Sequence, residues 1–161
     1  MARINLQMYS FADGNNEDTR ANLRAAARMG FDGVELFGPN FSIPAGEMKI
    51  ILTILKLEAV SLHAETENIE SMIPYAKTLG MKFIGIGMKN MFSDEEVHAY
   101  AKTLDELGAR CRQAGLTLTY HNHTQEFAPC GDRRIIDVLL QETSPENLSM
   151  ELDAGWCAAA G

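Results

Sequence analysis

The chain has 161 residues, of which 46% are hydrophobic and 22% charged, and its formal net charge is −8. These totals are typical of one soluble globular domain. The acidity argues against nucleic acid and against an anionic membrane surface, because both are bound through basic patches. No apolar run approaches the length of a membrane-spanning helix. A small sugar ligand or a bound cation suits this charge.

Cysteine use indicates the compartment. The three cysteines, Cys111, Cys130 and Cys157, are odd in number and widely spaced, and no two of them form a CxxC pair. This pattern predicts reduced thiols rather than a disulfide framework. The first residues also lack the apolar core of a signal peptide. We therefore expect a cytoplasmic protein.

Apolar strand-like segments alternate with amphipathic helical segments along the whole chain. In chain order, the pattern predicts a strand at 4–9, a helix at 19–29, a strand at 33–37, a helix at 45–57, a strand at 59–64, a helix at 69–79, a strand at 82–88, a helix at 94–114, a strand at 116–121, a helix at 133–141 and a strand at 148–153. Gly30 and Gly80 mark helix ends. Ser93 and Glu96 form a capping box that opens the longest helix. Residues 158–161 are expected to start a sixth helix.

The junction from helix to strand recurs as RMGFDGVEL, TLGMKFIGI and QAGLTLTYH. Six strands that alternate with helices predict a parallel sheet with helical crossovers. The strands start about 29 residues apart on average, and an eightfold barrel of such units has about 250 residues. We therefore expect 1–161 to form a single domain, a parallel (β/α) barrel of TIM type that has six of the eight βα units and lacks the last two.

Polar side chains recur at every second position in five of the six predicted strands. Since side chains alternate between the two faces of a strand, each of these strands has one polar face. The polar residues are Asn5, Gln7 and Tyr9; Glu35; Ser61, His63 and Glu65; Thr117, Thr119, His121 and His123; and Ser149, Glu151 and Asp153. The predicted helices have apolar faces and must cover the apolar side of the sheet. The polar side then faces the barrel lumen, where active sites lie at the C-terminal ends of the strands.

Two other interpretations of this alternation compete with the barrel. A half-exposed antiparallel strand shows the same pattern, with a polar face that is simply hydrated. A doubly wound open sheet would bury both faces under helices, which the polar positions contradict. His63 and Glu35 can also serve only as hydrogen-bonded interior residues.

Histidines and carboxylates cluster at the ends of the last two predicted strands. Buried charges are costly unless they are paired or bound to metal, and imidazole and carboxylate are ligands of divalent metals. Asp153 and His121 could share an ion if the two strands are neighbours. Such an ion polarises a carbonyl and stabilises an enediolate, while Glu151 or His123 moves protons. This is the chemistry of sugar isomerases and epimerases, and Trp156 could contact a sugar ring.

The chain resembles a known family in five segments: QMYSF, GFDGVELFG, SLHAE, TYHNHTQEF and MELDAGWCAAAG. They are similar to the sugar phosphate isomerase/epimerase group of xylose isomerase-like TIM barrels. That group also contains inosose dehydratase-like proteins. The segments span nearly the whole chain in the order the family has them, and the last two are the most specific.

The resemblance implies an eightfold barrel with one divalent metal, Mn, Co, Zn or Mg, bound at the ends of strands five to eight. Asp153 matches a metal ligand that ends strand six, and His121 matches a position where many members have a ligand glutamate. His123 matches a histidine two residues on, and Glu126 a nearby acid. The positions that match polar or substrate-contacting residues at the mouth of the barrel are Glu35, His63 and Trp156, with Tyr9 on the same parity.

Two departures from the family limit what the resemblance implies. His121 replaces a carboxylate that relatives use as ligand and base, and strands seven and eight, which supply a histidine and a glutamate, are missing. We therefore expect a metal-dependent sugar or sugar phosphate isomerase/epimerase, inactive as this chain alone. The alternatives are a lyase or dehydratase acting on a keto sugar or inosose, and a non-catalytic sugar-binding or assembly module. The expected partner is a small sugar, and unpaired sheet edges favour association between copies of the chain.

Overall fold

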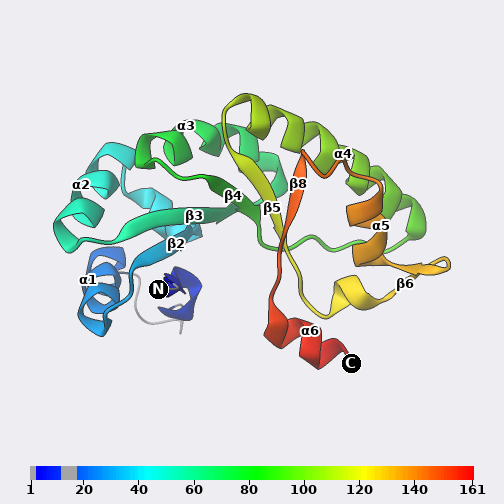
Figure 1. The fold of residues 1–161 in the computed structure, drawn as a ribbon, viewed down its shortest axis with the longest axis horizontal. Helices are drawn as coiled ribbons and strands as arrows, with labels where there is room; N and C mark the ends of the chain where they lie inside the picture. The colour runs from blue at the N-terminus through cyan, green and yellow to red at the C-terminus, as the bar shows by residue number, and fades with distance from the viewer. Residues whose placement is uncertain (1–2, 12–17) are drawn as a thin grey trace.

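A computed structural model describes residues 3–11 and 18–161 of the chain. Its centre is a six-stranded, fully parallel sheet in the order β1-β2-β3-β4-β5-β8 (Figure 1). The strands are β1 (Asn5–Gln7), β2 (Gly33–Phe37), β3 (Glu58–Ala64), β4 (Phe83–Ile86), β5 (Thr117–His121) and β8 (Leu148–Glu151). Neighbours in sequence are neighbours in the sheet, as in a barrel.

A helix follows each strand of this sheet. The helices are α1 (Thr19–Met29), α2 (Ala45–Leu55), α3 (Ile69–Leu79), α4 (Asp94–Gln113), α5 (Ile135–Gln141) and α6 (Ala154–Ala160). Figure 1 shows α2 to α5 along the convex side of the curved sheet, with α6 beyond the C-terminal ends of the strands. The predicted glycine stops are confirmed, since Gly30 (φ 87°) and Gly80 (φ 76°) end α1 and α3 in the left-handed conformation.

The core lies between the helices and the convex face of the sheet. Seven strand residues of the apolar parity are fully buried: Val34, Leu36, Leu62, Ile84, Ile86, Leu118 and Tyr120. The opposite parity faces the concave side, where Glu35 pairs in register with Ser61, and His121 with Glu151. The predicted separation of a polar and an apolar face is therefore confirmed, and it positions Glu35, His63, His121 and Glu151 on one surface.

The sheet is open. Among the described residues, β1 pairs only with β2, and β8 only with β5. The predicted fold class, an incomplete (β/α) barrel of TIM type, is confirmed, and the doubly wound alternative is wrong because helices cover only the convex face. Within the described part of the chain, none of the helices is both long and apolar enough to span a bilayer.

Three local details differ from the sequence prediction. β1 ends at Gln7, because the side-chain oxygen of Gln7 accepts a hydrogen bond from the Tyr9 backbone N–H (2.6 Å) and the chain turns into the 3-10 helix η1 (Met8–Phe11). The helix expected from 133 begins at 135, after a small hairpin of β6 (Pro129–Cys130) and β7 (Arg133–Arg134). The last helix begins at 154 rather than 158, because Asp153 caps it.

Candidate functional site

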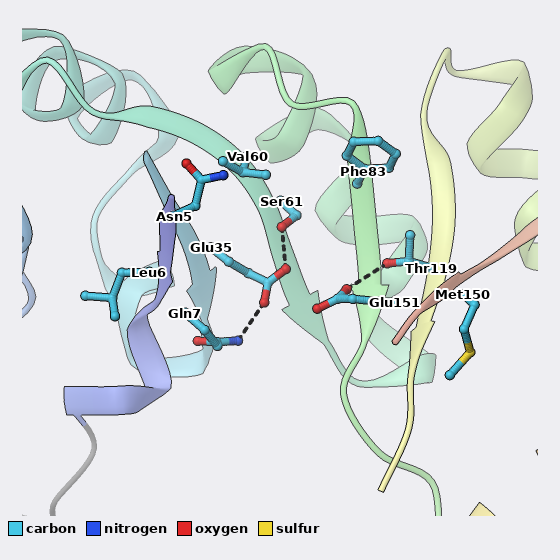
Figure 2. A pocket seen from close by; sticks show the side chains of 10 residues that line it. All are labelled: Asn5, Leu6, Gln7, Glu35, Val60, Ser61, Phe83, Thr119, Met150 and Glu151. Carbon is cyan, nitrogen blue, oxygen red and sulfur yellow. Dashed lines mark hydrogen bonds between the residues drawn. The ribbon is translucent and has the colours of Figure 1, made fainter. Parts of the chain in front are cut away.

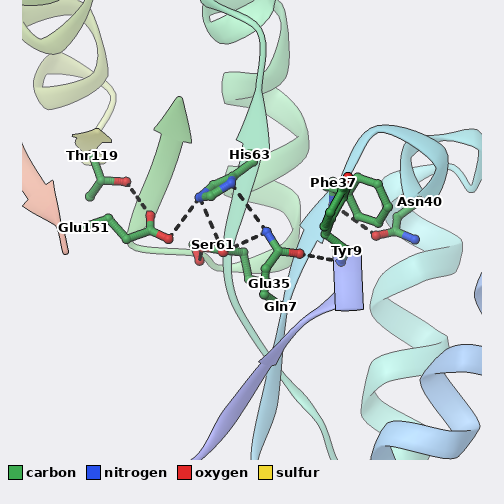
Figure 3. Close-up of polar contacts among 9 residues, drawn as sticks. All are labelled: Gln7, Tyr9, Glu35, Phe37, Asn40, Ser61, His63, Thr119 and Glu151. Carbon is green, nitrogen blue, oxygen red and sulfur yellow. Dashed lines mark hydrogen bonds and ion pairs between the residues drawn. The ribbon is translucent and has the colours of Figure 1, made fainter. Parts of the chain in front are cut away.

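Three ionisable side chains from strands far apart in sequence meet on the concave face. Nε2 of His63 (β3) lies 2.9 Å from Oε1 of Glu151 (β8) and 3.3 Å from Oε1 of Glu35 (β2). The side chains of His63 and Glu35 are each 12% exposed, and that of Glu151 is 30% exposed. Figure 3 shows the imidazole between the two carboxylates. We call these three residues the inner cluster.

A glycine in the sheet makes room for this arrangement. His63 pairs in register with Gly85 of β4, and β4 and β5 lie between β3 and β8, the strand that carries Glu151. A Cβ atom on Gly85 would lie 2.6 Å from Cδ2 of His63, closer than real contacts allow. The imidazole can therefore lie over β4 and reach Glu151 only because residue 85 has no side chain.

Neutral side chains fix both carboxylates of the inner cluster. Nε2 of Gln7 donates to Oε1 of Glu35 (3.0 Å), and the Ser61 hydroxyl donates to the other oxygen of Glu35. Thr119 donates to Oε2 of Glu151 at 3.1 Å. These hydrogen bonds orient both acids toward the imidazole before any ligand binds.

The same glutamine indicates the tautomer of His63. Its side-chain oxygen accepts from the backbone N–H of Tyr9, so its amide nitrogen faces Nδ1 of His63 at 3.4 Å. Since an amide N–H can only donate, Nδ1 acts as the acceptor and Nε2 carries the proton. That proton lies between two carboxylates, at the position where a metal ion could replace it.

The two carboxylates of the inner cluster differ in proton affinity. Burial raises the pKa of Glu35, and His63 only partly offsets this effect. Burial also acts on Glu151, but the hydrogen bond and charge of His63 outweigh it and lower the pKa of Glu151. For His63, burial alone lowers the pKa, whereas the hydrogen bond to Glu151 and the charges of both acids raise it overall. A pair of acids whose pKa values move apart is suited to one acid role and one base role.

The donor atoms of the inner cluster fit a divalent metal. One ligand atom each from Glu35, His63 and Glu151 all lie within 4.8 Å of one another, the only such group of three found among residues 3–11 and 18–161. Two carboxylates and one imidazole match the preferences of Mn²⁺, Fe²⁺, Co²⁺ and Zn²⁺.

Aromatic rings continue from the inner cluster toward the ends of β5 and β8. The ring centroids of His63 and His121 lie 5.4 Å apart, and those of His121 and His123 lie 4.7 Å apart. The ring centroid of Trp156 lies 5.3 Å from that of His123. Burial, followed by the charges of His63 and His123, lowers the pKa of His121, which keeps it neutral and able to bind metal. We call His121, His123, Asp153 and Trp156 the outer group.

A reciprocal hydrogen bond ties together the ends of β5 and β8. The buried Asn122 side chain accepts from the backbone N–H of Asp153 (2.9 Å) and donates to its carbonyl (3.2 Å). The Asp153 carboxylate accepts from the Trp156 backbone N–H (2.8 Å) and so caps α6. The structure thus brings Asp153 and His121 to the same edge of the sheet, but it does not place them in the three-ligand group.

The other two predicted site residues have different surroundings. The carboxylate of Glu126 is fully buried, and it accepts from the Tyr120 hydroxyl (2.9 Å) and from the backbone N–H of His123 (2.7 Å). It therefore fixes the backbone that carries His123. Tyr9 is 66% exposed and packs edge-on against Phe37, at the rim of the concave face.

His123 carries an unusual polar atom. Its Nδ1 is buried and has no hydrogen-bond partner among the residues that the structure describes. Since buried polar atoms are normally paired, this nitrogen is a candidate to contact a ligand.

A cavity of about 380 Å³ adjoins the inner cluster on the concave face (Figure 2). Glu35, Ser61, Thr119 and Glu151 line it with polar groups, and Phe83 is among its apolar neighbours. Its size falls within the range of small-molecule sites, roughly 300–1,000 Å³. The face therefore combines a cavity of ligand size with a polarised set of acids.

Sequence reasoning identified the individual residues but not the grouping. It assigned His63 and Glu35 to substrate contact and paired Asp153 with His121, whereas the structure joins Glu35, His63 and Glu151. The supporting residues Gln7, Ser61 and Thr119 share the parity of the cluster, and that parity is the signal that could have found them. Nothing in the sequence alone shows that Asn122 ties two strand ends together.

Comparison with solved structures shows the same fold in several enzymes. A sugar phosphate isomerase/epimerase from Parabacteroides distasonis superposes with a TM-score of 0.77 at 20% identity, over 98% of this chain and 70% of that one. An AP endonuclease, family 2, from Brucella melitensis superposes with a TM-score of 0.73 at 14% identity, over 96% of this chain and 69% of that one. The IOLI protein with a binding zinc atom superposes with a TM-score of 0.75 at 12% identity, over 99% of this chain and 66% of that one.

No protein-family model matches the chain, and no curated protein matches it by sequence. At identities of 20% and below, the structural likeness shows the fold alone. The chain has the fold of xylose isomerase-like TIM barrel proteins, as the sequence resemblance predicted. It spans about 70% of the length of the first of these structures, so the activity of a whole protein is a matter of proposal.

Proposed function

We propose that the chain carries the catalytic face of a divalent-metal-dependent isomerase or epimerase that acts on a sugar. The observation that supports this most directly is the meeting of Glu35, His63 and Glu151 on the concave face, next to a cavity of small-molecule size. The likeness in fold to a sugar phosphate isomerase/epimerase adds weight. The AP endonuclease shares the fold, but a net charge of −8 opposes binding of a nucleic acid backbone.

The inner cluster is the proposed metal-holding set, because its donor atoms already converge. When bound, a divalent cation supplies Lewis-acid polarisation of a substrate carbonyl. The outer pair Asp153 and His121, which the sequence favoured, is the alternative donor set, since the neutral state of His121 suits a ligand. The two sets share no residue, so substitutions can separate them.

The proton transfers are assigned to Glu151 and His123. Isomerisation and epimerisation both begin with removal of a proton from the carbon beside a carbonyl, and a positioned base makes this possible. Glu151 can take this role because its lowered pKa keeps it as the carboxylate that accepts a proton, and among the described residues its Oε2 accepts a hydrogen bond only from Thr119. His123 has a buried Nδ1 with no partner among the described residues, so it can exchange a proton with a substrate oxygen. Glu126 holds the backbone of His123 in place, and Trp156 offers an aromatic face to a sugar ring.

The open sheet has a consequence for activity. β1 and β8 each leave one edge unpaired among the described residues, so the concave face is not enclosed. We propose that 1–161 forms one (β/α) domain whose barrel is closed by further βα units or by another copy of the chain, and that it turns over no sugar before closure. The cytoplasm remains the proposed location, from the reduced state expected of the cysteines.

Titration of the chain with Co²⁺, followed by visible absorption and calorimetry, tests the metal site without relying on activity. We expect one site per chain, with affinity reduced at least about tenfold by His63→Gln and little changed by His121→Gln. If His121→Gln instead weakens Co²⁺ binding and His63→Gln does not, the outer pair is the metal site. Absence of saturable binding in the chain and in any closed form contradicts the proposal. For the reaction, deuterium uptake from D₂O beside the carbonyl of a ketose is measured by NMR in a closed form, and its absence over a broad sugar panel contradicts isomerase chemistry.

A further inference from the structure

The segments that follow the C-terminal ends of the strands are acidic. We define the mouth by the described residues of these segments: 8–11, 18, 38–44, 65–68, 87–93, 122–134 and 152–153. Their carboxylates are Asp18, Glu65, Glu67, Glu126, Asp132 and Asp153, and their cationic side chains are Lys89, Arg133 and Arg134. At the opposite, N-terminal ends of the strands, positive and negative side chains are equal in number. The cations are Arg3, Lys56 and Lys82, and the acids are Asp32, Glu142 and Glu146.

Each cation of the mouth is already engaged by a carboxylate. Nζ of Lys89 lies 3.0 Å from Glu67. Arg133 lies 2.7 Å from Glu142. Arg134 lies 2.8 Å from Asp137. An anionic group that bound one of these side chains would have to compete with its carboxylate.

Acids also stand in the cap or the first turn of every α-helix that begins at the mouth. A helix N-terminus can bind phosphate through its free N–H groups and its dipole. Here Asp18 caps α1, Asp153 caps α6, and the first turns of α2, α3, α4 and α5 carry acids. Asp18 and Asp153 accept the backbone N–H groups that a phosphate would use, and the acids in the first turns of the other four helices repel a phosphate by like charge.

The floor of the site, which we define as the concave face of the sheet with Glu35 and Glu151, is also negatively charged. None of the six described strands of the sheet contains a lysine or an arginine, while Glu35 and Glu151 project from the concave face. A cleft lined by one sign of charge concentrates ions of the opposite sign and repels those of its own sign. In the metal-free chain the potential is therefore negative from the mouth to the concave face; a cation held by the inner cluster offsets Glu35 and Glu151, and the acids of the mouth then carry the negative potential.

We propose that this site accepts an uncharged polyhydroxylated carbonyl compound, such as a free ketose or a cyclic polyol ketone, and discriminates against its phosphate ester. The inference rests on the proposed function for the carbonyl and on the charges above for the discrimination. A phosphate dianion is normally bound by unpaired Arg or Lys side chains or by helix N-termini. In the described mouth, each Arg or Lys already has a carboxylate partner, and each α-helix N-terminus carries an acid in its cap or first turn. Hydroxyl groups, in contrast, bind well to carboxylates and imidazoles such as those of the floor.

The single tryptophan of the chain tests the electrostatic part without any turnover. Trp156 of α6 packs against His123 of the mouth and is 43% exposed. Its fluorescence is quenched with iodide, caesium and neutral acrylamide, each normalised to free N-acetyltryptophanamide. Even about 1 kT of negative potential changes the local ratio of monovalent cation to anion by about sevenfold. We expect caesium to exceed iodide by roughly this factor at low salt, with the difference shrinking toward 0.5 M NaCl. Equal quenching, or stronger quenching by iodide, overturns the inference.

A matched pair of ligands tests the substrate class. D-Fructose and D-fructose 6-phosphate are titrated into the metal-loaded protein, and the ester is expected to bind at least about tenfold more weakly at low salt, with a gap that narrows as salt screens the charges. Tighter binding of the ester, abolished by Lys89→Gln and not by Lys102→Gln on the outer surface of α4, overturns the inference. If neither sugar binds, the proposed function fails, and the quenching result alone decides the electrostatic inference.

Discussion

Replacing Gly85 with alanine tests whether the inner cluster depends on the space over β4. The added Cβ would lie 2.6 Å from Cδ2 of His63, whereas ordinary contact begins at 3.4 Å, so the imidazole must move by about 0.8 Å. Such a movement away from Glu151 lengthens the present 2.9 Å hydrogen bond to roughly 3.7 Å, beyond hydrogen-bonding range. We expect Gly85→Ala to lower the free energy of unfolding by about 1–3 kcal/mol, as overpacking does. We expect it to weaken Co²⁺ binding by about 10–100-fold.

Urea unfolding followed by circular dichroism measures the first effect, and Co²⁺ absorption measures the second. Gly46→Ala is the matched control, because a Cβ on Gly46 meets no atom within 4 Å. In a helix, that change is expected to stabilise the chain by about 0.4–1 kcal/mol and to leave metal binding unaltered. If Gly85→Ala folds and binds Co²⁺ as tightly as the wild type, the position of His63 does not matter and the reasoning is refuted.

Three further predictions concern stability. Asn122→Ala removes both hydrogen bonds to Asp153 and should cost about 1–3 kcal/mol in urea unfolding, whereas an unchanged midpoint would show that the two strand ends hold together without it. The pKa of His63 is raised in the folded chain, so its stabilising contribution is present below about pH 6.5 and is lost as pH rises through the raised value. Metal-free wild type should therefore lose stability relative to His63→Gln above pH 6.5, and parallel pH profiles would contradict this. Gly108→Ala places a Cβ 1.9 Å from the Asn147 carbonyl oxygen, so soluble expression with a native unfolding midpoint would contradict the close packing of α4 on that loop.

The fold could be predicted from the sequence because the signals that define its helices and strands are local. Glycine stops such as Gly30 and Gly80, the capping residue Ser93 and the alternation along each strand all act within a few residues. Predicted and observed boundaries agree to within two residues for most elements. The exceptions need contacts that short-range patterns do not contain, such as the turn of the chain by Gln7 after β1.

The candidate site could be predicted only in part, because its geometry depends on contacts between residues of different strands. Parity correctly placed Glu35, His63, His121 and Glu151 on one face. It could not show that His63 would reach Glu151, 88 residues away in sequence, since that depends on Gly85 and on the curvature of the sheet. The metal and catalytic assignments made from the sequence therefore stay predictions.

The most direct test of a metal site on the concave face is anomalous diffraction from crystals of the chain soaked in Mn²⁺ or Zn²⁺. Our account predicts one strong peak at about 2.0–2.2 Å from Nε2 of His63 and from oxygens of Glu35 and Glu151. A peak on His121 and Asp153 would move the metal to the outer pair. Saturating metal with no peak anywhere on the concave face would contradict the account.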